Sequence, residues 1–157
     1  MNLVGSRWVY KIKRRADGSV ERYKARMVAQ GFIQEEGIDY SETFSPVIKP
    51  TIIWLVLTIA ISNGWLIHQL DVHNAFLNGI LQEEVYINQP RGFVHSDFPT
   101  HVCHFYKSFY GLKQAPRPWY MQLSDFLLSI GFQASKADTS LFILSYSGAL
   151  FYLLVYI

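Results

Sequence analysis

The chain has 157 residues, half of them apolar and 16% aromatic, so it is long enough for one domain with a buried core and is not a disordered segment. Its single cysteine excludes an internal disulfide, its longest apolar stretch (residues 52–61) is too short to span a bilayer, and no secretory signal is visible, which together predict an intracellular protein, cytoplasmic or nuclear, without a membrane partner. Residues 1–30 carry eight of the 14 basic and two of the 12 acidic residues; this basic lobe suits a polyanion ligand, although a solvated surface explains the charge equally well.

The first 30 residues predict a β-hairpin. Residues 7–14 alternate along the chain as a strand does, the Asp-Gly pair at 17–18 suits a tight turn, and residues 20–28 form the return strand. The basic residues of the return strand share one face by the two-residue period of a strand. They are Arg22, Lys24 and Arg26.

The next predicted elements lead to a carboxylate. Residues 31–50 predict a loop, because glycine and proline punctuate them. A buried helix is predicted over residues 51–63, and a buried strand over residues 65–72. Asp71 lies at the end of that strand, where a carboxylate is costly to dehydrate unless it is solvated, paired or bound to a cation. Taken alone, a capping or solvated aspartate is the default interpretation.

Two short strands, a helix and a second hairpin complete the prediction. The strands cover residues 84–88 and 101–109, and an amphipathic helix covers residues 115–131. Residues 141–145 and 149–157 form the hairpin, whose second strand is almost wholly apolar and suits the middle of a sheet in a domain that continues further. Strands and helices do not alternate regularly, which favours an α+β fold.

Several other residues invite a functional interpretation that their spacing favours less. His68 alternates with apolar neighbours and predicts a core histidine. The His-Val-Cys-His run at 101–104 is better explained by strand alternation than by a zinc site, which takes four ligands at wider spacing. Tyr110 and Trp119 can stack on nucleic-acid bases, whereas Tyr120 lies on the apolar stripe of its helix and predicts core packing.

Four longer motifs follow one another along the chain. They are Arg-Trp-Val-Tyr-Lys (7–11) with Tyr-Lys-Ala-Arg-Met-Val-Ala-Gln-Gly-Phe (23–32), Asp-Tyr-Ser-Glu-Thr-Phe-Ser-Pro-Val (39–47), Gln-Leu-Asp-Val-His-Asn-Ala-Phe-Leu-Asn-Gly (69–79), and Tyr-Gly-Leu-Lys-Gln-Ala-Pro-Arg-Pro-Trp-Tyr (110–120). Together they resemble the reverse transcriptase of copia-type LTR retrotransposons. The resemblance implies an RNA-directed DNA polymerase with a right-hand fold. Residues 1–50 would be fingers-like and residues 51–157 mostly palm, forming an N-terminal part of the pol polyprotein that stops before the second catalytic motif and the thumb.

The resemblance also implies roles for single residues. Asp71 matches the first catalytic aspartate, and the backbone carbonyl of Val72 a second metal contact, in a transfer that uses two Mg²⁺ or Mn²⁺ ions. Phe76 matches the sugar gate that blocks a 2′-hydroxyl, while Lys24 and Arg26 lie in the stretch that reaches the incoming deoxynucleotide triphosphate. The RNA or DNA template-primer would be lined by Lys113, Gln114 and Pro116.

One departure from the family pattern bears on activity. The family's other two catalytic carboxylates lie in a Tyr-x-Asp-Asp turn, whose first two positions match Tyr156 and Ile157, the last residues of the chain. A lone carboxylate cannot hold two ions about 4 Å apart, so we expect the chain as given to be inactive and to bind metal weakly. A non-catalytic nucleic-acid-binding remnant and a non-functional pseudogene product stay as alternatives. Trp54, where the family pattern has a basic residue, and Pro118 fit a decaying copy of an element.

Overall fold

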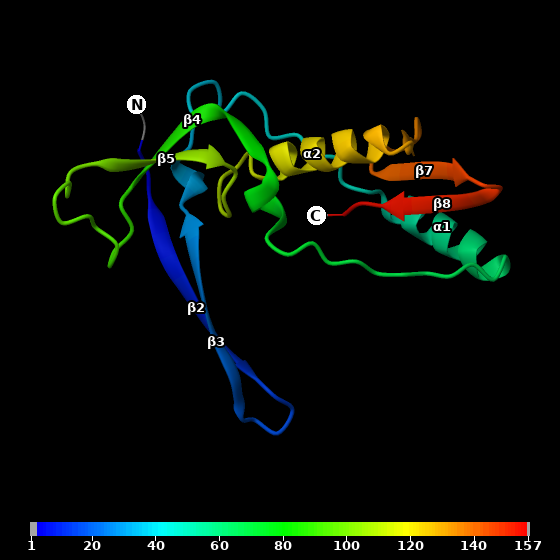
Figure 1. Ribbon diagram of the computed structural model, residues 1–157, viewed down its shortest axis with the longest axis horizontal. Helices are drawn as coiled ribbons and strands as arrows, with labels where there is room; N and C mark the ends of the chain where they lie inside the picture. Colours follow the sequence, from blue (N-terminus) through cyan, green and yellow to red (C-terminus); the bar gives the residue numbers. More distant parts are fainter. Residues whose placement is uncertain (1–2, 157) are drawn as a thin grey trace.

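The computed structural model describes residues 3–156, which form a mixed fold of small β-sheets and two α-helices (Figure 1). Strand orders are β1-β4-β5, β2-β3 and β6-β7-β8. Within the described residues, no helix is both long and apolar enough to cross a membrane. In chain order the elements are β1 (Leu3–Val4), β2 (Ser6–Arg14), β3 (Val20–Ala29), η1 (Gly31–Ile33), α1 (Pro50–Ser62), η2 (Ala75–Asn78), β4 (Ile80–Asn88), β5 (Val102–Lys107), α2 (Pro116–Ser129), β6 (Gln133–Ala134), β7 (Leu141–Tyr146) and β8 (Ala149–Leu154).

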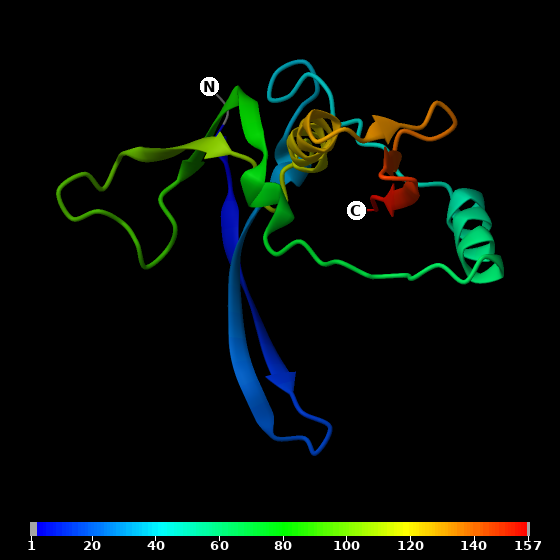
Figure 2. The same cartoon turned by 45° about the vertical axis from the view of Figure 1, so that its right-hand side comes forward.

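The predicted first hairpin is confirmed as β2 and β3, a long antiparallel ribbon that projects from the rest of the molecule (Figures 1 and 2). Its turn works as the sequence indicates. Gly18 adopts a φ of 84°, a conformation that other residues rarely adopt. The Asp17 carboxylate accepts the Ser19 backbone N–H at 2.9 Å. The turn and the strand alternation are both local features, which is why the sequence alone predicts this element.

The base of the hairpin packs on the sheet of β4 and β5. Val4, Ala29 and Ile87 belong to a buried cluster at this junction. The hairpin is fixed there by main-chain hydrogen bonds to the segment that follows β5, including Ala29 N–H to the Tyr110 carbonyl at 2.8 Å. Gly111 makes this close approach possible, because its φ is 91° and a Cβ there would collide with the Ala29 carbonyl.

A second buried cluster joins α2 to the sheet of β7 and β8. Trp119, Leu127, Phe142 and Val155 form its centre. Tyr120 packs beside it and donates its hydroxyl to the Thr139 carbonyl at 2.7 Å, consistent with the predicted core role of this tyrosine. These elements confirm the predicted helix and terminal hairpin. Among residues 3–156, β8 lies at an edge of its sheet, so its second neighbour is not found within the described residues.

The carboxylate of Asp138 connects the loop before β7 to the start of α1. Its two oxygens accept the backbone N–H groups of Ser140 at 2.9 Å and Lys49 at 3.1 Å. Burial raises the pKa of the carboxyl group, but these hydrogen bonds outweigh that effect, so the pKa of Asp138 is held below its usual value. The charged form of Asp138 therefore stabilises the junction.

Two predictions about the middle of the chain are wrong. α1 forms, but it is not a buried helix: Val56 and Ala60 are its buried residues, while Trp54 is 70% exposed. Residues 65–72 form no strand, and Leu66 among them is 88% exposed. An apolar sequence predicts that burial is favourable but does not supply the neighbour that buries it.

The exposed segment 65–72 contacts β8 and the residues after it through side chains. The Trp65 ring stacks on Tyr152 with centroids 5.3 Å apart, and the Gln69 amide donates to the Tyr156 hydroxyl at 3.0 Å. His68, on the same segment, is exposed, so the prediction of a core histidine is also wrong. Ile157 lies outside the described residues.

Candidate functional site

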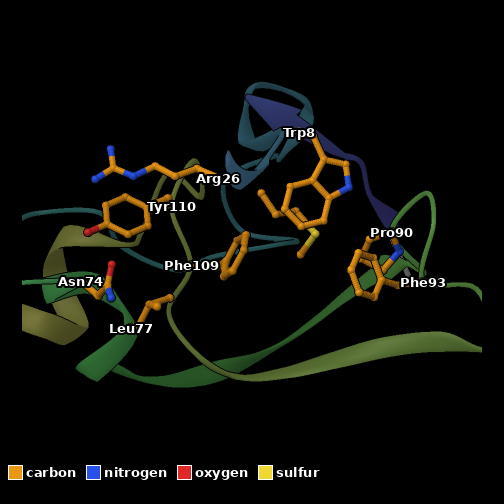
Figure 3. A pocket seen from close by; sticks show the side chains of 9 residues that line it. Trp8, Arg26, Asn74, Leu77, Pro90, Phe93, Phe109 and Tyr110 are labelled. Carbon is orange, nitrogen blue, oxygen red and sulfur yellow. The ribbon is translucent and has the colours of Figure 1, made fainter. Parts of the chain in front are cut away.

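A hollow of about 440 Å³, called here the hairpin hollow, lies where the β2–β3 hairpin meets the body of the molecule (Figure 3). Its walls come from four places: the hairpin, η2, the loop after β4 and the segment after β5. Figure 3 shows Arg26, Tyr110 and Asn74 toward one end and aromatic rings toward the other. The lining residues are Trp8, Arg26, Met27, Asn74, Leu77, Pro90, Phe93, Phe109 and Tyr110.

Tyr110 holds the polar end of the hairpin hollow together. The Arg26 guanidinium carbon lies 5.6 Å from the centre of the Tyr110 ring, within cation–π range. Phe76 contacts the same ring, with centroids 5.0 Å apart, and also meets Trp119 edge-on at 6.5 Å. Two of the residues predicted from the motifs, Arg26 and Phe76, are thus brought together from β3 and η2 by a third residue.

The apolar end of the hairpin hollow is closed by contacts between the hairpin and the loop of residues 89–101. Trp8 and Phe93 pack at 5.8 Å, and the Trp8 indole N–H donates to the Arg91 carbonyl at 3.2 Å. The Gln89 side chain organises this loop, because its amide donates to the Phe98 carbonyl at 2.7 Å. The hollow therefore combines a cationic rim with a wall of aromatic rings.

The cations predicted on the hairpin do share one face. Lys11 pairs directly with Lys24, and Lys13 with Arg22, while Arg26 follows on the same side. Repulsion from Arg26, followed by partial desolvation and repulsion from the other three cations, lowers the pKa of Lys24. A bound anion would relieve that repulsion. This basic face comprises Lys11, Lys13, Arg22, Lys24 and Arg26.

Asp71 is not among the residues that line the hairpin hollow. Its side chain is 88% exposed and its carboxylate lies 3.8 Å from the His73 Nε2, with Val72 about half exposed between them. The expected costly burial of this carboxylate is therefore absent. Within residues 3–156, no cluster of three or more His, Cys, Asp or Glu side chains could hold a metal ion. The described residues thus do not fit a complete site for the metal pair that the resemblance implies.

The segment predicted to line the template-primer is divided between solvent and core. Lys113 is exposed, and its ammonium donates to the Gln34 carbonyl at 2.9 Å and lies 5.7 Å from the Tyr40 ring. Gln114 is 1% exposed, and its amide has no hydrogen-bond partner among the described residues. It borders a second hollow of about 230 Å³, whereas Pro116 is the half-buried first residue of α2. These three residues do not reach the hairpin hollow.

The sequence indicates Tyr110, Arg26 and Phe76 as separate candidates but not that they contact one another. Tyr110 opens the fourth motif, and an aromatic residue at a motif boundary is a reasonable base-stacking candidate. That it contacts both Arg26 and Phe76 depends on the docking of the hairpin onto the segment after β5. Trp8 lies in the first motif, but strand alternation also explains it, so the sequence does not predict that it lines the hairpin hollow.

Comparison with known proteins matches this chain over its whole length. The model of the family described as reverse transcriptase (RNA-dependent DNA polymerase) matches residues 1–157. The chain is 54% identical over 157 residues to the retrovirus-related Pol polyprotein from transposon RE2 of Arabidopsis thaliana, and 53% identical to that from transposon RE1; it covers 11% of each. It is 45% identical over 141 residues to the Pol polyprotein from transposon TNT 1-94 of Nicotiana tabacum, of which it also covers 11%. No solved structure matches.

Proposed function

The chain belongs to the reverse transcriptase (RNA-dependent DNA polymerase) family, and from this premise we propose that it supplies the nucleotide and template-primer contacts of a copia-type enzyme. The reaction would be template-directed nucleotidyl transfer to a primer on RNA or DNA. One observation carries the proposal: the Arg26 cation and the Phe76 ring both contact the same side chain, Tyr110, which lines the hairpin hollow. A triphosphate and a sugar need those two kinds of contact.

Arg26 would bind the triphosphate of the incoming nucleotide. A guanidinium can grip phosphate oxygens with two parallel hydrogen bonds, and stacking over Tyr110 holds its plane in place. Lys24, two residues along the same face, would act as a point charge that raises the local positive potential. The mutual repulsion of the basic face favours uptake of an anion, because binding removes part of that repulsion.

Phe76 would exclude ribonucleotides by its bulk. A steric gate must be rigid, since a ring that can rotate away leaves room for the 2′-hydroxyl. Phe76 meets that requirement: it is packed against Tyr110 and Trp119 and touches both buried clusters. Phe76 lies on η2, between the lining residues Asn74 and Leu77, and its ring contacts a third lining residue, Tyr110.

We keep Asp71 and the backbone carbonyl of Val72 as proposed contacts to a divalent cation, Mg²⁺ or Mn²⁺, in the intact family enzyme. Their chemistry is right, because these ions take hard oxygen ligands. The remaining ligands are not brought together by residues 3–156. We therefore propose that the 157 residues by themselves do not catalyse nucleotidyl transfer.

We further propose that residues 1–50 are fingers-like and that residues 51–157 are mostly palm. The protein would be the intracellular product of a retrotransposon. The projecting hairpin supports the first assignment (Figure 2). Exposed Lys113 and half-buried Pro116 suit contacts to template or primer. Gln114 is buried, so its contribution would be to hold that segment in place.

A second function, nucleic-acid binding without catalysis, is favoured by the basic face together with the isolated, exposed Asp71. Two assays on the 157-residue protein test what both functions predict for it, duplex binding through the basic face and no catalysis. Binding of a primer-template duplex should weaken in Lys24→Ala/Arg26→Ala, and the slope of log affinity against log salt should become shallower by about 0.9 for each phosphate that is no longer neutralised. Lys136→Ala, an exposed cation outside the hairpin, is the matched control. Unchanged duplex affinity in the double variant would refute the role of the basic face.

Primer extension tests the catalytic half of the proposal. The purified chain should add no nucleotide to a primer-template with Mg²⁺ or Mn²⁺, because a single exposed carboxylate cannot align two ions. Incorporation above that of an Asp71→Asn variant would overturn the claim of inactivity. It would also show that ligands beyond those described assemble in solution.

A further inference from the structure

The side of the β2–β3 hairpin opposite the basic face carries exposed aromatic rings. Tyr10 and Tyr23 are 74% and 77% exposed, and Ile12 is 48% exposed. Tyr10 pairs with Ala25 and Ile12 pairs with Tyr23, so these side chains lie on one side of the ribbon. Single exposed apolar residues are ordinary, but a row of them on a projecting ribbon marks an interaction surface (Figure 2).

This aromatic face continues directly into the hairpin hollow. Trp8 and Met27 pair with each other at the base of the same face, and both line the hollow. At the other end, the strand register shifts between Lys13 and Arg14, and the Arg14 guanidinium donates to the Gly18 carbonyl in the turn at 2.9 Å. The aromatic face, defined as Trp8, Tyr10, Ile12, Tyr23 and Met27, therefore runs from the hollow to a cation at the tip.

The spacing of the two tyrosines suits a flat ring between them. Because Tyr10 faces Ala25, Tyr10 and Tyr23 are diagonal neighbours across the two strands. Diagonal side chains lie roughly 7–8 Å apart, about twice the 3.5–4.0 Å contact distance between carbon atoms. A flat nucleobase placed between the two rings would therefore lie at contact distance from each of them. Every base offers a π-face, whatever its identity.

Charge decides between a nucleic acid and an apolar protein segment as the occupant. Residues 1–30 carry eight basic and two acidic residues, a net charge of +6, and five of those cations form the opposite face of the same ribbon. A phosphate backbone that follows the ribbon is attracted by those cations and by Arg14. An uncharged protein segment would gain nothing from them.

We propose that the aromatic face binds the single-stranded part of the template by base stacking as it approaches the hairpin hollow. The inference rests on the proposed function and adds where, and by which contact, the unpaired strand is held. Stacking on Tyr10 and Tyr23 accepts any base sequence, as template transit requires. It also orders the strand ahead of the hollow without a base-specific hydrogen bond.

The test measures binding of a labelled single-stranded RNA of about 15 nucleotides to the 157-residue protein by fluorescence anisotropy, over a range of salt concentrations. Tyr10→Ala and Tyr23→Ala should each weaken binding about fivefold or more, the low end for base–aromatic stacking. Tyr10→Phe and Tyr23→Phe should retain affinity, because the ring remains. Tyr106→Ala is the matched control, since Tyr106 on β5 is equally exposed at 74%.

The salt dependence separates this inference from the proposed function. Loss of stacking leaves the slope of affinity against salt unchanged, whereas Lys24→Ala/Arg26→Ala reduces it. If the double variant lowers the slope but both tyrosine variants bind within about twofold of the parent, stacking is refuted and the proposed function stands. If neither the tyrosine variants nor the double variant changes the affinity or the salt slope, both the inference and the proposed function are refuted. Equal weakening by Tyr106→Ala would also refute the inference, because the effect would not belong to the hairpin.

A folding defect is controlled directly. Both tyrosines are more than two-thirds exposed, so the thermal melt of each variant should match that of the parent. Should an alanine variant unfold, Tyr10→Thr and Tyr23→Thr keep a strand-favouring residue without a ring, and the same loss of affinity is expected. A blunt duplex of equal length should bind the parent and the tyrosine variants alike, because its bases are not available for stacking.

Discussion

Phe76 links the two buried clusters to the candidate site, so its removal should have a clear effect on stability. It is half-buried, touches both clusters and packs on Tyr110 and Trp119. Full burial of a phenylalanine makes truncation to alanine cost about 3–5 kcal/mol. Partial exposure reduces this to about 2 kcal/mol, and loss of the two ring pairs adds about 0.5 kcal/mol each. We expect Phe76→Ala to lower the free energy of unfolding by about 3 kcal/mol.

Urea unfolding followed by tryptophan fluorescence measures this difference, provided the transition is two-state. Phe44→Ala is the matched control, because Phe44 is 68% exposed and its loss should change stability by less than about 0.5 kcal/mol. Phe76→Tyr should keep most of the packing. A loss below about 1 kcal/mol in Phe76→Ala would refute the reasoning, because it would mean that the ring is not held from both sides and cannot act as a rigid gate.

Three further predictions follow from particular contacts. The pKa of Asp138 is lowered in the folded state, so its carboxylate stabilises the fold above the unfolded pKa near 3.8, and this contribution is lost as the pH falls below that value. Asp138→Asn removes the titrating group, so the difference between the urea midpoints at neutral and at acid pH should be smaller in this variant than in the parent. Gly111→Ala should destabilise far more than Gly92→Ala in thermal melts: both have positive φ, but only at Gly111 does the new Cβ meet backbone, and equal losses would contradict the close approach. Leu150 lies on the uncharged edge strand β8, which can pair with the same strand of another molecule, so Leu150→Lys should reduce the light scattering of concentrated protein. Val94→Lys is the matched control, because both residues are 53% exposed, and an equal reduction in both variants would exclude pairing at this edge.

Elements with local causes could be predicted from the sequence, and elements with distant causes could not. The hairpin follows from alternation and an Asp-Gly turn, and α2 from a proline at its start and an apolar stripe, so both are confirmed. Residues 65–72 have a strand-like composition, but a strand forms only with a hydrogen-bonded neighbour, and the described residues place none beside them. Likewise α1 is apolar on all sides, so its sequence carries no information on which face is covered.

The site shows the same division. Arg26 and Phe76 were found because each lies in a motif, but their meeting at Tyr110 arises from main-chain hydrogen bonds between the hairpin and the segment after β5. Gln114 lies in the same motif as Tyr110, yet its side chain is buried, at 1% exposure. A motif therefore names candidate residues but does not indicate which of them are exposed and which are buried.

The two halves of the proposed site have different structural requirements, and this difference makes them separable by experiment. The nucleotide half, with Arg26, Tyr110 and Phe76, is held by contacts entirely within the described residues. The metal half rests on Asp71, an exposed carboxylate on a segment without strand partners among residues 3–156. Nucleotide and single-strand binding should therefore survive Asp71→Asn unchanged. If that substitution instead weakened binding of nucleotide in the absence of divalent metal, the two halves would be structurally coupled, and Asp71 would contribute to the hairpin hollow, which it does not line here.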